Sequence, residues 1–208
     1  MRIAGKSSIF IVSLLFSLIQ FSCKESPVET VEQLDDEGRT ERFQRDKKNF
    51  AKEGLYQKFS TDGKLLIEAQ YHHDTLNGER KYFYESGAVE TVEHFKNGQY
   101  HGKYSKYNED GSLSLEQDFV NGAMQGFSIA YYPNGNIQER VTIVDSEENG
   151  PFQEYYENGV LKTEGFYGPS ELESALEQGE LKEYNEQGEL IRIADCQDGR
   201  CETRWKKE

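Results

Sequence analysis

Glycine, aromatic and aliphatic residues return in the same order along most of this chain, with a period of 24 residues. Each unit opens at a glycine, with an aromatic residue five positions later, a second glycine after nine and an aliphatic residue after eleven. The opening glycines are Gly54, Gly78, Gly102, Gly126, Gly150 and, after a longer gap, Gly179. Self-similarity at about 20 to 50 residues is typical of stacked-repeat proteins. The pattern therefore predicts six structural repeats.

Each repeat reads as two short strands joined by a turn that ends at the second glycine. In Pro133-Asn134-Gly135 the proline suits a type I turn and the glycine suits the left-handed region, which favours a three-residue hairpin loop. Such a loop sets Tyr131 opposite Ile137 on one face of the sheet. The aromatic positions are Phe59, Phe83, Tyr107, Tyr131, Tyr155 and Tyr184, and the aliphatic ones are Leu65, Val89, Leu113, Ile137, Leu161 and Leu190.

A third apolar position follows seventeen residues after the opening glycine, at Tyr71, Phe95, Phe119, Ile143 and Tyr167. We expect it to share the face of the aliphatic position and to complete a thin core that neighbouring repeats bury together. The sequence thus predicts an all-β fold, an elongated, single-layer antiparallel β-meander of about six tandem β-hairpin repeats over residues 49–208.

The fifth repeat carries extra residues between Gly168 and Gln178. Ser170 and Glu173 have the spacing of a capping box, and Leu172, Ala175 and Leu176 would share one helical face, which predicts a short helical insertion of about two turns. A tolerated loop insertion explains the extra residues equally well.

The first 22 residues read as a secretory signal, with Arg2 and Lys6 ahead of the apolar stretch from Ile9 to Ile19. Cys23 follows this stretch and resembles the lipobox cysteine of bacterial lipoproteins, in the looser form of the Bacteroidetes type. The resemblance implies lipidation at Cys23 and an exported protein that is lipid-anchored to the cell envelope, at the outer membrane. An ordinary cleaved signal with an incidental cysteine is the alternative.

Residues 23–48 are rich in charge and poor in apolar side chains, so we expect a tether after the lipidated cysteine. The formal charge of the chain is −14, and removal of residues 1–22 deletes Arg2 and Lys6 and no acid, which gives −16. This balance excludes nucleic acid as a partner and limits membrane contact to the lipid anchor.

Cys196 and Cys201 flank an Asp-Gly turn, and an exported compartment permits a disulfide. We expect the two thiols to pair and, with Trp205, to cap the last repeat. A redox or metal role is the alternative.

Units such as Asn121-Gly122-Ala123-Met124-Gln125-Gly126, followed by Tyr131-Tyr132-Pro133-Asn134-Gly135, resemble a variant of the MORN repeat. The chain is similar over about residues 50–200 to the YwqK-type antitoxin-like family of bacterial proteins. The resemblance implies a ribbon of β-hairpins, and the antitoxin label implies neutralisation of a toxin.

Catalytic and metal sites are not predicted. His72 and His73 are adjacent, so strand geometry would turn them to opposite faces, and the carboxylates lie along an open ribbon without a cleft. The sequence holds no phosphate-binding loop, serine elbow or cysteine–histidine pair. We therefore expect no enzyme, no cofactor and no metal.

The face opposite the predicted core carries aromatic residues at the second and sixth positions after the opening glycine. Tyrosine is enriched in binding hot spots, so these rings predict an interaction ladder, although aromatic residues also suit strands in general. A protein partner fits a scaffold or an immunity-like role, and the alternative is a cell-surface polysaccharide that stacks on the rings. The candidates are Tyr56, Tyr84, Tyr104, Tyr132, Phe152 and Tyr156.

Overall fold

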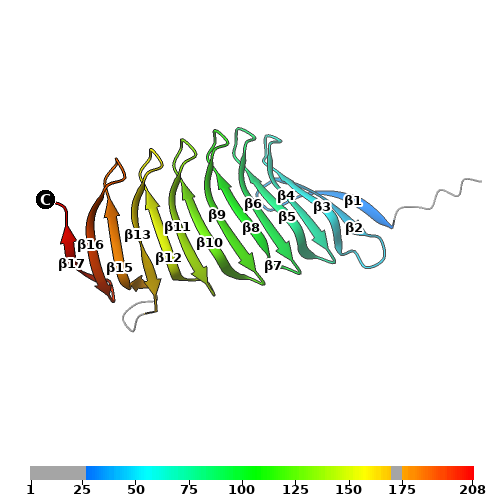
Figure 1. Ribbon diagram of the computed structural model, residues 1–208. Helices are drawn as coiled ribbons and strands as arrows, with labels where there is room; N and C mark the ends of the chain where they lie inside the picture. Colours follow the sequence, from blue (N-terminus) through cyan, green and yellow to red (C-terminus); the bar gives the residue numbers. More distant parts are fainter. Residues whose placement is uncertain (1–26, 170–174) are drawn as a thin grey trace, which may run out of the picture.

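The computed structural model describes residues 27–169 and 175–208, which form one open, single-layer antiparallel sheet (Figure 1). The strands pair in chain order, and the short strands β7 and β14 each lead into the strand that follows. Strands β1 and β17 lie at the two ends of the ribbon. The predicted all-β hairpin meander is confirmed. The described residues hold no helix, and thus none long and apolar enough to cross a membrane.

The ribbon contains 17 strands. They are β1 (Val28–Leu34), β2 (Thr40–Asp46), β3 (Lys52–Phe59), β4 (Leu65–His72), β5 (Thr75–Phe83), β6 (Val89–Lys96), β7 (Gln99–Tyr100), β8 (Gly102–Tyr107), β9 (Leu113–Val120), β10 (Ala123–Tyr131), β11 (Ile137–Val144), β12 (Glu147–Tyr155), β13 (Leu161–Gly168), β14 (Leu176–Glu177), β15 (Gly179–Tyr184), β16 (Leu190–Gln197) and β17 (Arg200–Lys206).

The hairpin loops have the three-residue form that the sequence predicts. In the β10–β11 hairpin the Tyr132 N–H donates to the Asn136 carbonyl at 2.8 Å and the Gly135 N–H donates to the Tyr132 carbonyl at 2.9 Å. Gly135 has a φ of 86°, the left-handed value that such a loop requires. Tyr131 then pairs directly with Ile137, and the equivalent pair recurs in all six repeats.

A bulge beside each loop reverses the faces that the sequence predicts. Tyr131 pairs with Ile137 but Ala130 pairs with Glu139, so β11 carries one extra residue. One extra residue turns the side chains beyond it to the other face. The prediction that Ile143 shares a face with Ile137 is therefore wrong. We call the face of Ile143 the core face and the face of Tyr131 and Ile137 the outer face.

The core face holds two clusters of buried apolar residues, and buried Phe95 lies between them with its ring against Tyr100. One contains Phe43, Tyr56 and Ala69, and the other contains Val141, Ile143, Phe152, Leu181, Ala194 and Cys196. Between them, Arg80 pairs with the buried Glu93 at 2.5 Å, and the Tyr100 hydroxyl donates to the same carboxylate at 2.8 Å. The buried charges are thus paired and hydrogen-bonded, as stability requires.

Three of the opening glycines allow successive repeats to approach closely. Gly150 has a φ of 137°, and a Cβ atom on it would lie 2.8 Å from the Thr142 Cβ. Gly78 and Gly102 likewise have positive φ and would meet the side chain eight residues earlier at 3.0 and 3.1 Å. At these three positions both the backbone conformation and the lack of space thus select glycine.

Two expectations outside the regular repeats need correction, and a third falls largely outside the described residues. The expected tether contains β1 and β2, and Phe43 of β2 is buried in the core, so the sheet begins at Val28 and not near residue 49. Five residues of the expected helix, 170–174, lie outside the described residues, and Leu176 belongs to β14. Trp205 is an exposed residue of the edge strand and does not cap the core.

Candidate functional site

The six aromatic residues predicted to form an interaction ladder do not share an exposed surface. Tyr56 and Phe152 have exposed fractions of 8% and 3% and lie in the two core clusters. Tyr104 occupies the equivalent position of the third repeat and is half-buried. For these three residues the prediction is wrong, because the bulge makes their face the core face.

Tyr84, Tyr132 and Tyr156 are half-buried and connect successive repeats. Each hydroxyl donates to the backbone carbonyl at the aromatic position of the next repeat. The acceptors are Tyr107 for Tyr84 at 2.8 Å, Tyr155 for Tyr132 at 2.9 Å and Tyr184 for Tyr156 at 2.8 Å. These rings stabilise the stacking of the repeats, and a binding role for them stays a prediction.

Removal of the three hydroxyls together should weaken the fold measurably. Each Tyr→Phe change at Tyr84, Tyr132 and Tyr156 deletes one hydrogen bond worth about 1 kcal/mol, and well-separated sites add. We expect the triple variant to lose about 3 kcal/mol of unfolding free energy in urea titrations. A triple variant that unfolds with the midpoint of the parent chain would contradict this connecting role.

The outer face carries an exposed apolar row across β10 to β13, formed by Phe127, Pro151 and Phe166. Pro151 is the cross-strand partner of Phe166. Thr142 is the cross-strand partner of Phe127, and its hydroxyl donates to the Pro151 carbonyl at 2.8 Å. Phe127 and Phe166 have exposed fractions of 37% and 43%. We refer to these three residues as the apolar row.

Charged and polar side chains hold the equivalent outer-face positions on either side of the apolar row. Toward the N-terminus Lys103 pairs with Asp118 at 3.3 Å, and toward the C-terminus Arg204 pairs with Asp195 at 3.2 Å and also with Glu180. The apolar row is thus a bounded interruption in a charged stripe. An apolar centre with a polar rim is the usual anatomy of a protein-binding surface.

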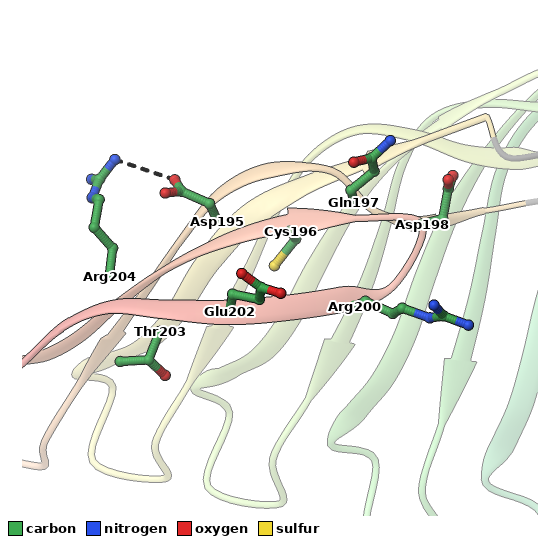
Figure 2. A pocket seen from close by; sticks show the side chains of 8 residues that line it. All are labelled: Asp195, Cys196, Gln197, Asp198, Arg200, Glu202, Thr203 and Arg204. Atoms are coloured by element: carbon green, nitrogen blue, oxygen red, sulfur yellow. Dashed lines mark hydrogen bonds and ion pairs between the residues drawn. The ribbon is translucent and has the colours of Figure 1, made fainter.

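The last hairpin forms a shallow hollow lined by residues of β16 and β17 (Figure 2). Cys196 and Cys201, the pair expected from the sequence, are cross-strand partners joined by a disulfide. The hollow contains acids and bases in near balance, among them Asp198, Arg200 and Glu202. This balance gives it no preference for an anionic or a cationic ligand, so we do not consider it the functional site.

The core face is acidic where the fourth and fifth repeats meet. Glu139 pairs directly with Glu154 across β11 and β12, and burial together with the Glu154 charge raises the pKa of Glu139. Burial and nearby carboxylates, Glu177 first among them, raise the pKa of Tyr167 to about 12. Lys162 offsets part of this charge through an ion pair with Glu154 at 3.0 Å. Anionic ligands are therefore disfavoured on this face.

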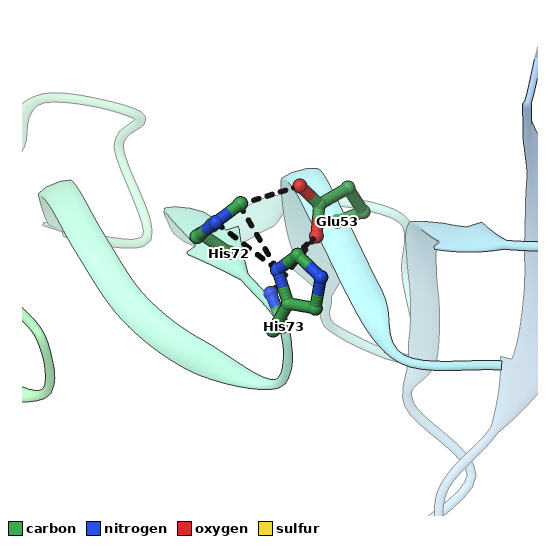
Figure 3. Close-up of side chains that lie close together, drawn as sticks. All are labelled: Glu53, His72 and His73. Atoms are coloured by element: carbon green, nitrogen blue, oxygen red, sulfur yellow. Dashed lines mark hydrogen bonds and ion pairs between the residues drawn. The ribbon is translucent and has the colours of Figure 1, made fainter. Parts of the chain in front are cut away.

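His72 and His73 do not point to opposite faces, contrary to the prediction. His73 lies in the β4–β5 turn with a φ of 49°, and the two imidazole rings lie 4.2 Å apart, beside the Glu53 carboxylate (Figure 3). Strand alternation does not apply at a turn residue, which is why the sequence argument failed.

This geometry defines a class of protein: a hairpin-repeat ribbon with a packed face, an outer face and an exposed apolar row. The model of the MORN repeat variant family matches residues 52–73, 76–97, 100–121, 128–145 and 148–167, together half of the chain. The chain belongs to this family.

Comparison with other proteins adds little to this assignment. No curated protein matches the chain. Among the solved structures, a porin-like protein from Bacteroides uniformis ATCC 8492 is 9% identical and covers 85% of this chain and 92% of its own, with a TM-score of 0.22. A likeness at that TM-score carries no argument.

Proposed function

We propose that this chain is a non-enzymatic, lipid-anchored repeat scaffold that binds a protein partner through the apolar row. The observation that carries the proposal is the exposure of Phe127 and Phe166 on the outer face, within a charged rim. The core clusters lie on the other face, so these rings are available for an interface without disruption of the fold. Aromatic anchors at the centre of an interface commonly contribute about 2 kcal/mol or more each to binding.

A protein partner is favoured over a polysaccharide by the surroundings of Phe127. The Arg140 guanidinium lies 3.8 Å from the centre of the Phe127 ring and covers one of its faces. A sugar that stacks on this ring would have to displace the arginine or use the opposite face, whereas a protein side chain can contact the ring edge. Both a scaffold and an immunity-like role use this surface.

The apolar row is tested by a Phe127→Ser/Phe166→Ser variant in intact cells, with crosslinking and recovery of co-purified protein. The matched control is Phe50→Ser/Trp205→Ser, which removes two exposed aromatic residues elsewhere on the ribbon. We expect recovery of the partner to fall about tenfold or more for the row variant and to stay unchanged for the control.

Both variants should unfold within about 1 kcal/mol of the parent chain, because the replaced rings are exposed. Equal recovery of the partner by the row variant and the parent would refute the proposed surface. Binding of soluble saccharides that the row variant loses would instead favour the polysaccharide alternative.

The lipid anchor is tested separately by Cys23→Ser. The change removes the thiol that would carry the lipid, so we expect the protein to move from the membrane fraction to the soluble fraction of fractionated cells. The motivation is the apolar stretch that ends just before Cys23. Retention of the variant in the membrane fraction would show that this thiol is not the anchor.

A further inference from the structure

We propose that Glu53, His72 and His73 form a surface site for a divalent transition-metal ion of the zinc type (Figure 3). Glu53 lies on β3, His72 ends β4, and His73 opens the turn into β5. Imidazole nitrogens and a carboxylate oxygen are ligands that zinc prefers. Three protein ligands leave one tetrahedral position for water or for a donor atom from a partner.

The donor atoms already lie near the spacing that a tetrahedral ion needs. Ligands at about 2.0 to 2.1 Å from zinc are about 3.4 Å from one another. The His72 Nδ1 lies 3.3 Å from the His73 Nδ1, and the His73 Nδ1 lies 3.6 Å from the Glu53 Oε2. The His72 Nδ1 and the Glu53 Oε1 are 2.6 Å apart in a hydrogen bond. The His73 Nδ1 also lies 3.0 Å from the His72 Nε2, and the two ring planes are inclined by 81°, so this nitrogen lies over the His72 ring. Rotation of one exposed ring would aim both Nδ1 atoms at a metal ion, which would replace the proton between His72 and Glu53.

The turn that presents the histidines is held in place by its own hydrogen bonds. The Asp74 carboxylate accepts a hydrogen bond from the Lys52 N–H at 2.8 Å, and the Asp74 N–H donates to the Lys52 carbonyl at 3.1 Å. The Glu53 Oε2 accepts the His73 N–H at 2.8 Å. The backbone of the site is therefore already ordered, and metal binding requires rotation of exposed side chains only, which favours affinity.

The first repeat departs from the others at this turn. Its two central residues, His73 and Asp74, share the positive φ of the equivalent turns but differ from them in residue type. The equivalent turns use an asparagine or aspartate followed by glycine or serine, at Asn97-Gly98, Asn121-Gly122, Asp145-Ser146 and Asp198-Gly199. Histidine thus stands where a simple turn residue would suffice. With side-chain exposed fractions of 58% for His72 and 64% for His73, both rings are accessible to an ion from solvent.

Zinc binding by the full chain tests the proposal, in a Cys23→Ser background that removes the remaining thiol outside the disulfide. Titration of zinc chloride against a chromophoric chelator should give one site for the parent chain. We expect His72→Ala/His73→Ala to weaken zinc binding about 100-fold or more and Glu53→Gln to weaken it about tenfold. The matched control, His94→Ala/His101→Ala, removes the other two histidines and should bind zinc as the parent does.

Cobalt absorption provides a second readout, because a tetrahedral site gives intense visible bands that loss of His72 and His73 should abolish. Urea titrations check that each variant folds, as expected for exposed side chains. Absence of zinc binding by the parent at concentrations up to about 1 mM, an affinity far weaker than that of built zinc sites, would overturn the proposal. Zinc binding that survives in the His72→Ala/His73→Ala variant would overturn it equally.

Discussion

Gly150→Ala is expected to destabilise the protein by about 3 kcal/mol or more. The new methyl group would lie 2.8 Å from the Thr142 Cβ, a distance that neighbouring β11 cannot accept without moving. The backbone φ of 137° adds strain, because residues with a Cβ rarely adopt such a conformation. Overpacking costs about 1 to 3 kcal/mol and a left-handed backbone about 1 to 2 kcal/mol, and here the two effects act together.

The matched control is Gly135→Ala in the adjacent hairpin loop. Gly135 also has positive φ, at 86°, but no atom lies within 4 Å of a Cβ placed there. We therefore expect a loss of about 1 kcal/mol from backbone strain alone. Urea unfolding followed by circular dichroism measures both variants. Equal losses at Gly150 and Gly135 would show that close approach of the strands does not select the opening glycine.

Phe152→Ala is expected to cost about 3 to 5 kcal/mol, the usual range for a large ring removed from a packed core. The Phe152 ring stacks on Tyr167 with centres 4.2 Å apart and planes inclined by 21°. It also fills the space over Gly165, where a Cβ would lie 2.7 Å from the ring. The variant would leave a cavity between β12 and β13 that the second core cluster cannot readily fill.

Phe166→Ala is the matched control for Phe152→Ala. It makes the same chemical change on the neighbouring strand, but on the outer face of the sheet. Phe166 is exposed to 43%, so we expect a loss of about 1 kcal/mol or less. Thermal melting and urea titration should separate the two variants clearly. If Phe166→Ala proved the more damaging change, the assignment of core and outer faces would be reversed.

The repeat, the hairpin and the loop type could be predicted because each depends on local chemistry. A glycine nine residues after another, preceded by turn-forming residues such as Pro133-Asn134, specifies the loop, and the loop length fixes the pair Tyr131 and Ile137. Because the sequence repeats every 24 residues, the same hairpin and loop are expected in every repeat. No contact between distant residues is needed for any of these inferences.

Which side chains lie on the core face could not be predicted, because no particular residue type marks the position of the bulge. The bulge residue lies twelve residues after the opening glycine; in the fourth repeat it is Gln138, which has no partner in the register of β10 and β11. In other repeats this position holds residues as different as Leu66, Glu90 and Lys162. Alternation counted straight through that residue assigns every later side chain to the wrong face. That error made buried Tyr56 and Phe152 look like a binding surface.

The first hairpin was missed for a different reason. Strands β1 and β2 contain few apolar residues and are joined across the register by ion pairs, Arg42 with Glu32 at 2.9 Å and Arg45 with Glu29 at 2.7 Å. A charge-rich composition predicts a tether when these partners are unknown. Two sites were also missed. The apolar row on the outer face can be recognised only once the two faces are correctly assigned, and the His72-His73 site only once the conformation of the turn is known.

The direction of the interstrand hydrogen bonds determines how the ribbon responds to mechanical force. These bonds are perpendicular to the strands and thus run along the length of the ribbon (Figure 1). Tension between the two ends therefore loads the strand pairs in series and peels hairpins away one at a time from an edge, as in a zipper. Each 24-residue repeat released in this way adds up to about 80 Å of extended chain. A ribbon held at one end would thus lengthen stepwise under load while the remaining repeats stay folded.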